Sequence, residues 1–155
     1  MKKNFLTIAS ICGIFLLSSF CVNANPADDH STVNEKVLKS FHSVFNGASN
    51  VQWAKYGDHF SVSFLQDQII VRAEYDKEGN LLSSIRYYNA ERLPLNILFN
   101  VKKEYANEKI DVVTEVSVPE GTAYIIQLED DKGWTILHSD VEGNLTVKDS
   151  FDKAK

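Results

Sequence analysis

Three kinds of polar side chain in this sequence could do chemistry: histidines, serines and carboxylates, the last partly in a repeated turn. None of the histidines has another His, Cys or acidic residue at a metal-ligand spacing within one element. The run Asp28-Asp29-His30 could bind a metal weakly, but a solvated tail explains it better. The remaining histidines are His42, His59 and His138. We therefore expect no metal site and no cofactor.

The serines and the acidic cluster do not form a recognisable catalytic set. The serines occupy alternating strand positions or turns, and none lies in a Gly-x-Ser-x-Gly elbow. Glu129-Asp130-Asp131 could in principle act as a general acid or base. These residues precede Lys132-Gly133, however, and the combination is typical of a hairpin loop. The sequence favours a protein without catalytic residues, although a hydrolase built from scattered polar residues remains an alternative.

An acidic turn occurs twice. Asp76-Lys77-Glu78-Gly79-Asn80-Leu81 returns 64 positions later as Asp140-Val141-Glu142-Gly143-Asn144-Leu145, with five of six residues identical. Asp at the first position can accept bonds from its own backbone, and Gly three residues later can take a positive φ. The alternative, a calcium loop, would need a longer ligand series and a distant bidentate Glu. The motif predicts two equivalent β-hairpins and a duplicated domain.

The first residues have the pattern of a secretory signal peptide. Lys2 and Lys3 precede an almost wholly apolar stretch, and Val22-Asn23-Ala24 gives a small-x-small cleavage site. We expect a signal peptide over residues 1–24, a flexible tail over 25–31 and a periplasmic or secreted product. A membrane anchor and a lipid anchor on Cys21 are weaker alternatives, because the apolar run is short and Phe20 replaces the small residue of a lipobox.

Cysteines and charge restrict the class of protein further. Both cysteines, Cys12 and Cys21, precede the predicted cleavage site, so the mature chain would have no disulfide. Removal of Lys2 and Lys3 lowers the 16 basic residues to 14 against 21 acidic ones, which gives a net charge of −7. Because no basic cluster is present, we expect no nucleic-acid partner. We also expect no stable membrane insertion after signal cleavage.

The residues after the tail predict a helix and four strands. Thr32 and Glu35 form a capping box, an apolar face recurs from Val33 to Phe45 at the 3.6 period, and Gly47 would be a left-handed cap. Alternating residues then predict strands over 51–55, 60–64, 69–75 and 81–88. Their connections are too short for crossovers, so the strands should be antiparallel.

The second half repeats this plan. Its helical apolar residues stand 60 positions after those of the first half, with Pro94 in the first turn and Asn107 in the place of Gly47. In the strands the offset becomes 64, and Tyr124, Ile126 and Leu128 match Phe60, Val62 and Phe64. The change of offset predicts about four extra residues in the second helix-to-strand connection.

These elements predict an α+β fold, with two tandem helix-plus-four-strand repeats that form one antiparallel sheet of about eight strands and both helices on one face. We expect one domain over residues 32–151, with repeats 32–90 and 91–151. Trp53, Tyr75-Asp76-x-Glu-Gly-Asn-Leu, Leu93-Pro94 and the helix end at Tyr105 resemble the bacterial β-lactamase-inhibitor-like (BLIP-like), or PepSY-like, exported proteins. The resemblance implies this same fold.

The resemblance also bears on function. The inhibitors that give the family its name bind an enzyme with the open sheet face and its loops, whereas most members have no assigned function. This sequence departs from the inhibitors because it has no cysteine after the signal peptide, and no inhibitory loop carries over residue by residue.

The strand phase predicts what the helix-free face of the sheet presents. In the first half that face should carry Ser61, Ser63, Ile70, Arg72 and Glu74. The offset of 64 then places Ile125, Gln127, Trp134, Ile136 and His138 on the same face of the second half. A bulge that flips this strand is the alternative, and it would expose Thr135 and Leu137 and bury Trp134 and Ile136.

An exposed Trp with two Ile and a His is typical of a protein-binding surface. The sequence therefore predicts a non-catalytic periplasmic binding or inhibitor-like protein. Its partner would be a periplasmic or cell-envelope protein or peptide, held by Ile125, Trp134, Ile136 and His138. The alternative use of the same face is a homodimer of an envelope protein.

Overall fold

A computed structural model describes residues 33–154 of the chain. The predicted signal peptide over 1–24, the tail over 25–31, Thr32 and Cys21 lie outside these residues. None of the described helices is long and apolar enough to cross a lipid bilayer.

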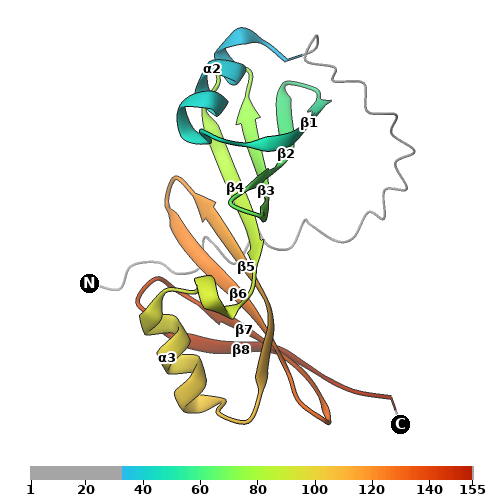
Figure 1. The fold of residues 1–155 in the computed structure, drawn as a ribbon, viewed down its shortest axis with the longest axis vertical. Helices are drawn as coiled ribbons and strands as arrows, with labels where there is room; N and C mark the ends of the chain where they lie inside the picture. Colours follow the sequence, from blue (N-terminus) through green and yellow to red (C-terminus); the bar gives the residue numbers. More distant parts are fainter. Residues whose placement is uncertain (1–32, 155) are drawn as a thin grey trace.

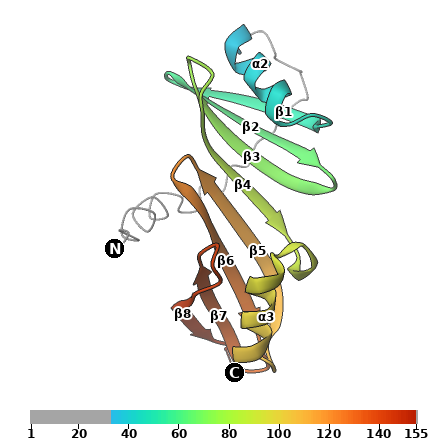
Figure 2. The ribbon, with the colours of Figure 1, turned by 90° about the vertical axis from the view of Figure 1, so that its left-hand side faces the viewer.

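Eight strands form one antiparallel sheet in chain order, and two helices lie on one side of it (Figures 1 and 2). This arrangement confirms the predicted fold. The elements of the first half are α2 (Glu35–Val44), β1 (Ser49–Tyr56), β2 (His59–Gln66), β3 (Ile69–Asp76) and β4 (Leu81–Tyr88). A short helix η2 (Ala90–Arg92) leads to α3 (Leu95–Glu104), β5 (Lys109–Val118), β6 (Gly121–Glu129), β7 (Gly133–Ser139) and β8 (Leu145–Asp152).

The core lies between the helices and the sheet. Each helix contributes one buried stripe, formed by Val37 and Phe41 in α2 and by Ile97 and Val101 in α3. Burial of one such side chain stabilises the fold by about 1.5–3 kcal/mol. The sheet contributes the alternate residues that the sequence predicted: Phe60, Val62, Phe64, Val71, Ala73, Tyr75, Tyr124, Ile126 and Leu128 are all buried.

The helix ends differ from the predictions. Asn34, and not Thr32, caps α2, because its side-chain oxygen accepts a hydrogen bond from the backbone N–H of Val37 at 3.0 Å. Helix α2 ends at Val44, and the left-handed Gly47 lies in the turn that follows. Asn107 does not have a positive φ, so the predicted left-handed Asn cap of α3 is wrong.

The two repeated turns confirm the hairpin prediction. Gly79 and Gly143 take φ of +90° and +89°, the left-handed region that favours glycine. In each turn the Asp accepts hydrogen bonds from the backbone and side chain of the Asn four residues later: Asp76 from Asn80, and Asp140 from Asn144. Identical residues therefore build identical turns.

The four extra residues of the second half lie in a hairpin, and not in the helix-to-strand connection. The connections after α2 and α3 have the same length, and each contains an equivalent backbone bond, from Ala48 to Phe45 and from Glu108 to Tyr105. Trp53 pairs with Val62 nine residues later, whereas its counterpart Val113 pairs with Ile126 thirteen residues later. The insertion thus lengthens β5 and β6, so the predicted position is wrong.

The pairing of β4 with β5 joins the two halves into one sheet. Residues 84–88 of β4 pair with residues 113–117 of β5 in antiparallel register. On the helix side of this junction, the hydroxyl of Tyr88 donates to Glu115 at 2.6 Å, and Arg86 forms an ion pair with Glu115 at 3.6 Å. The junction of the two halves therefore has polar contacts on the helix side of the sheet.

Candidate functional site

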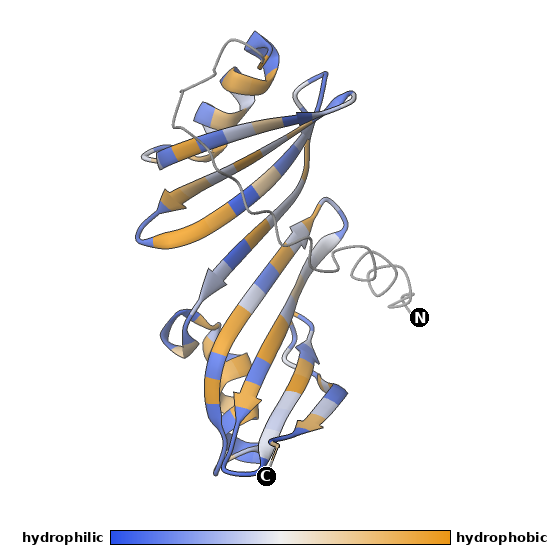
Figure 3. Ribbon diagram, turned by 90° about the vertical axis from the view of Figure 1, so that its right-hand side faces the viewer, coloured by the Kyte–Doolittle hydropathy of each residue, from blue (hydrophilic) through white to orange (hydrophobic). Residues whose placement is uncertain are grey.

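Strand β7 has the predicted phase. Leu137 is fully buried on the helix side, and Trp134, Ile136 and His138 lie half-buried on the opposite face. Figure 3 views the sheet from its helix-free side. The flipped-strand alternative, which would expose Leu137, is therefore wrong. A bulge is present in this region, but it lies in β8, where Lys148 is the extra residue opposite Ile136 and Leu137. The bulge leaves the alternation of β7 unchanged.

The register brings the four predicted residues together. Ile125 of β6 lies directly opposite His138 of β7, and Ile136 lies opposite Gln127, the next residue of β6 on the same face. Trp134 stands two residues before Ile136 and therefore lies on the same side of β7. The sheet thus forms one surface from residues that are up to thirteen positions apart in the sequence.

The apolar surface extends further than the sequence analysis predicted. Thr114 of β5 lies opposite Ile125, and Tyr87 of β4 lies opposite Thr114. Ile70 of β3, in the first half, lies opposite Tyr87. Ile85 and Val116 form a neighbouring pair, and Phe151 lies opposite Trp134. We call the whole set the open-face surface: Ile70, Ile85, Tyr87, Val116, Ile125, Trp134, Ile136 and Phe151.

Sequence reasoning missed the members of this surface that lie in β4, β5 and β8. The alternation within β4 could have suggested Ile85 and Tyr87, but the register between β4 and β5 could not be obtained from local periodicity. Ile70 and Phe151 are each 51% exposed, and the members between them in the sheet are half-buried. The surface therefore has its most accessible apolar side chains near its two ends.

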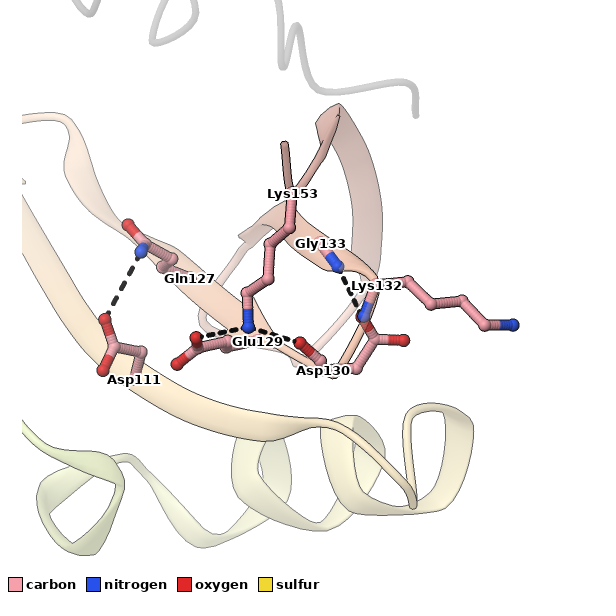
Figure 4. Close-up of polar contacts among 7 residues, drawn as sticks. All are labelled: Asp111, Gln127, Glu129, Asp130, Lys132, Gly133 and Lys153. Atoms are coloured by element: carbon pink, nitrogen blue, oxygen red, sulfur yellow. Dashed lines mark hydrogen bonds and ion pairs between the residues drawn. The ribbon is translucent and has the colours of Figure 1, made fainter. Parts of the chain in front are cut away.

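A cation lies over an aromatic ring near each end of the open-face surface. The guanidinium of Arg72 is 5.9 Å from the ring centre of Tyr87, and the ammonium of Lys153 is 5.2 Å from that of Trp134. Lys153 also donates to the carbonyl of Asp130 and pairs with Glu129, both at 2.7 Å (Figure 4). Trp134 is thus held in place by a cation that is itself anchored by two oxygens.

The acidic loop at the end of β6 acts as a turn. Asp130 accepts hydrogen bonds from the backbone N–H groups of Gly133 and Lys132 at 2.8 and 2.9 Å (Figure 4). These bonds hold the pKa of Asp130 below its ordinary value, and Lys153 does the same for the pKa of Glu129. General acids and bases work best with a pKa near the working pH, and the lowered pKa values of Asp130 and Glu129 lie further from neutrality.

The histidines and turn carboxylates are not arranged around a common point. Within residues 33–154 no three His, Cys, Asp or Glu residues gather in a way that could hold a metal ion. Burial, with a smaller contribution from Lys148, lowers the pKa of His138, so its imidazole is neutral at pH 7. Both carboxylate oxygens of Asp76 already accept bonds from their own turn.

The fold is similar to that of several solved bacterial proteins. A BLIP-like protein from Bacteroides fragilis matches with a TM-score of 0.63 at 16% identity, over 79% of this chain and 89% of the other. A protein from Bacteroides eggerthii described as periplasmic matches with 0.59 at 13%, over 77% and 88%. A DUF2874 family protein from Bacteroides ovatus matches with 0.59 at 17%, over 78% and 88%.

No model of a protein family and no curated protein matches the chain. The PepSY-like part of the resemblance stays a prediction. At these identities the likeness concerns the fold: the eight-stranded antiparallel sheet with two helices on one side is that of the BLIP-like proteins.

Proposed function

We propose that this protein is a non-catalytic binding protein of the periplasm and that it holds a protein or peptide partner on the open face of its sheet. The observation that carries the proposal is the open-face surface, which spans both halves and is not covered by either helix. Contiguous apolar patches with a polar rim mark interaction sites on soluble proteins. The predicted signal peptide and the likeness to a protein described as periplasmic support the location.

Trp134 is the proposed anchor of this interface. Ile136 follows it on the same face of β7, and His138 with its cross-strand partner Ile125 continues the surface. A half-buried Trp adds a large contact area, and the cation of Lys153 already limits its movement. The first half contributes Ile70, Ile85 and Tyr87, with Arg72 beside them. A partner with apolar side chains at its centre and carboxylates at its edge would match this arrangement.

Affinity capture from periplasmic extract tests the proposal. The bait is the mature chain, compared with Trp134→Ala and with the control Val44→Ala, which removes an apolar side chain that is 50% exposed on α2. We expect wild type and Val44→Ala to retain the same partner, and Trp134→Ala to retain at least about tenfold less of it. Equal retention by all three baits would refute the assignment.

Two further measurements separate binding from folding. Chemical denaturation of Trp134→Ala should show a loss well below the 3–5 kcal/mol that is typical of truncating a buried aromatic residue. In a Trp53→Phe background, Trp134 is the only tryptophan, so its fluorescence should change when the purified partner is added. Sedimentation of the bait alone distinguishes a partner from a homodimer on the same face.

A further inference from the structure

The outer side of α3 carries apolar residues that the core does not use. Leu95 is 83% exposed and Phe99 is 68% exposed, the highest values among the exposed large hydrophobic residues of the described chain. They stand one helical turn apart, so their side chains are neighbours. The core side of the same helix is formed by Ile97 and Val101. Helix α3 therefore has a second apolar face, which points away from the sheet.

The duplicated first half shows that the fold does not require this second face. The positions 60 residues earlier, in α2, are Glu35 and Lys39, an opposite-charge pair of the kind found on solvated helices. The turns that contact the two helices differ in the same way, with an apolar residue in place of a charged one. Val141, 49% exposed, stands where the first half has Lys77. Three charged positions of the first half are thus apolar in the second.

The cations of the second half are also placed differently. Lys102 and Lys103 lie in the last turn of α3, three and four residues after Phe99, and both are exposed. Their counterparts in α2 are His42 and Ser43. One exchange runs the other way, since Val44 of α2 corresponds to Glu104 of α3 at the end of the helix. The outer side of α3 therefore combines a protruding apolar pair with two adjacent ammonium groups.

The size of this face favours a lipid surface over a second protein chain. A stable protein interface buries about 1,200–2,000 Å² in total, and two protruding side chains with Val141 supply only a small part of that. A lipid bilayer needs much less, because Leu and Phe side chains can enter the boundary between headgroups and acyl chains while Lys side chains meet lipid phosphates. No other described element lies over α3 (Figure 2).

We propose that α3 docks the protein reversibly on an anionic phospholipid surface through Leu95 and Phe99, with Lys102 and Lys103 at the lipid phosphates. Helix α3 and the open-face surface lie on opposite sides of the sheet (Figures 2 and 3). Docking through α3 therefore leaves the open face directed away from the membrane. This surface is independent of the partner site proposed above.

Vesicle flotation with the mature chain tests the proposal. The vesicles are phosphatidylcholine alone or phosphatidylcholine mixed with phosphatidylglycerol, each at low and high salt. We expect wild type to float with the anionic vesicles at low salt and to be released by high salt, because the Lys contribution is screened. No flotation with anionic vesicles, or equal flotation with both kinds, would overturn the proposal.

The first half supplies the matched variant. Leu95→Glu combined with Phe99→Lys places the residues of α2 on α3, adds a favourable charge pair and leaves the core side unchanged. We expect the double variant to keep its urea midpoint and to float at least about tenfold less. Trp134→Ala serves as the control and should float like wild type.

The same variants also test whether a second copy of the chain, and not a lipid surface, binds to α3. If wild type sediments as a dimer and Leu95→Glu with Phe99→Lys makes it a monomer, α3 is a dimer interface and the lipid proposal is wrong. Flotation of the double variant at the wild-type level would also refute it. A monomeric wild type that loses flotation in the double variant supports it.

Discussion

Tyr75 and Tyr88 are both buried on the helix side of the sheet, and they differ in what their hydroxyl groups meet. The hydroxyl of Tyr88 donates to Glu115, whereas that of Tyr75 has no hydrogen-bond partner among the described residues. Burial raises the pKa of Tyr75 to about 12. It also raises the pKa of Tyr88, with a further contribution from Glu115. The hydroxyl of Tyr75 is thus a cost to the fold, whereas that of Tyr88 forms a hydrogen bond.

We therefore expect Tyr75→Phe to leave the free energy of unfolding unchanged or to increase it, because an unpaired buried hydroxyl costs about 1–3 kcal/mol. Tyr88→Phe is the matched comparison and should destabilise, because the carboxylate of Glu115 would lose its donor. Urea denaturation of both variants measures the difference. A loss in Tyr75→Phe as large as that in Tyr88→Phe would show that Tyr75 has a partner in solution.

At the scale of the elements, the repeated turns hold the helices as well as the strands. The side-chain amide of Asn34 at the start of α2 donates to the carbonyl of Lys77, and Asn96 and Asn100 of α3 donate to the carbonyls of Val141 and Gly143, each at 2.9 Å. A Cβ added to Gly79 would lie 2.8 Å from the carbonyl oxygen of Lys36, and one added to Gly143 would lie 2.9 Å from Asn100. Each glycine therefore serves the turn conformation and the helix contact together.

Gly79→Val and Gly143→Val should each destabilise the protein. The left-handed φ alone costs a residue with a Cβ about 1–3 kcal/mol, and the close helix contact adds to it. Gly57→Ala is the control, since its φ is +61° but a Cβ there would meet nothing within 4 Å. Chemical denaturation should rank both Val variants below Gly57→Ala. An undisturbed Gly143→Val protein would contradict the equivalence of the two turns.

At the scale of the whole molecule, the β4–β5 pairing makes one sheet from two repeats and allows the open-face surface to cross between them. The same strands carry the contacts of Tyr88 and Arg86 with Glu115 on the other side. Together with the hydrogen bond from Arg92 to the carbonyl of Asp67, this strand pair connects the two halves.

Stability should depend on pH in a predictable direction. The side chain and backbone of Asn80 hold the pKa of Asp76 below 3.8, and Lys77 does the same for the pKa of Asp58. The ionised form is favoured in the folded protein, so this contribution is present above about pH 4 and is lost as pH falls through the lowered values. Tyr75 acts in the opposite direction: burial disfavours its ionised form, so the stability of the fold decreases as the pH rises above about 10.

Urea midpoints measured from acid to alkaline pH should therefore show a plateau between about pH 5 and 9 with a fall on each side. Asp76→Asn should reduce the difference between pH 7 and about pH 2.5, because one group with a lowered pKa no longer titrates. An unchanged acid slope in this variant would mean that Asp76 does not have the lowered pKa assigned to it.

The sequence by itself determined the elements and the faces that they bury. Alternation in 60–64 and 69–75, helical periodicity from Val33 to Phe45 and the repeated Asp-x-Glu-Gly-Asn turns are local patterns, and each is confirmed in the described residues. The phase of β7 could also be predicted, because identical turns follow β3 and β7, and equivalent residues of the two strands therefore face the same side of the sheet. Helix caps were less predictable, since Asn34 and Thr32 are both good capping residues. In the folded chain Asn34 also donates a hydrogen bond to the turn at Lys77.

The tertiary structure alone decided how distant segments meet. The register between β4 and β5 joins Ile85 and Tyr87 to the predicted patch. The pairing of β5 with β6, compared with that of β1 with β2, places the four extra residues in the β5–β6 hairpin. The position of Lys153 over Trp134, the close approach of Lys36 to Gly79 and the exposure of Leu95 and Phe99 likewise depend on contacts between residues far apart in the chain. Local periodicity sets which way a side chain points, but the packing of whole elements sets what it meets.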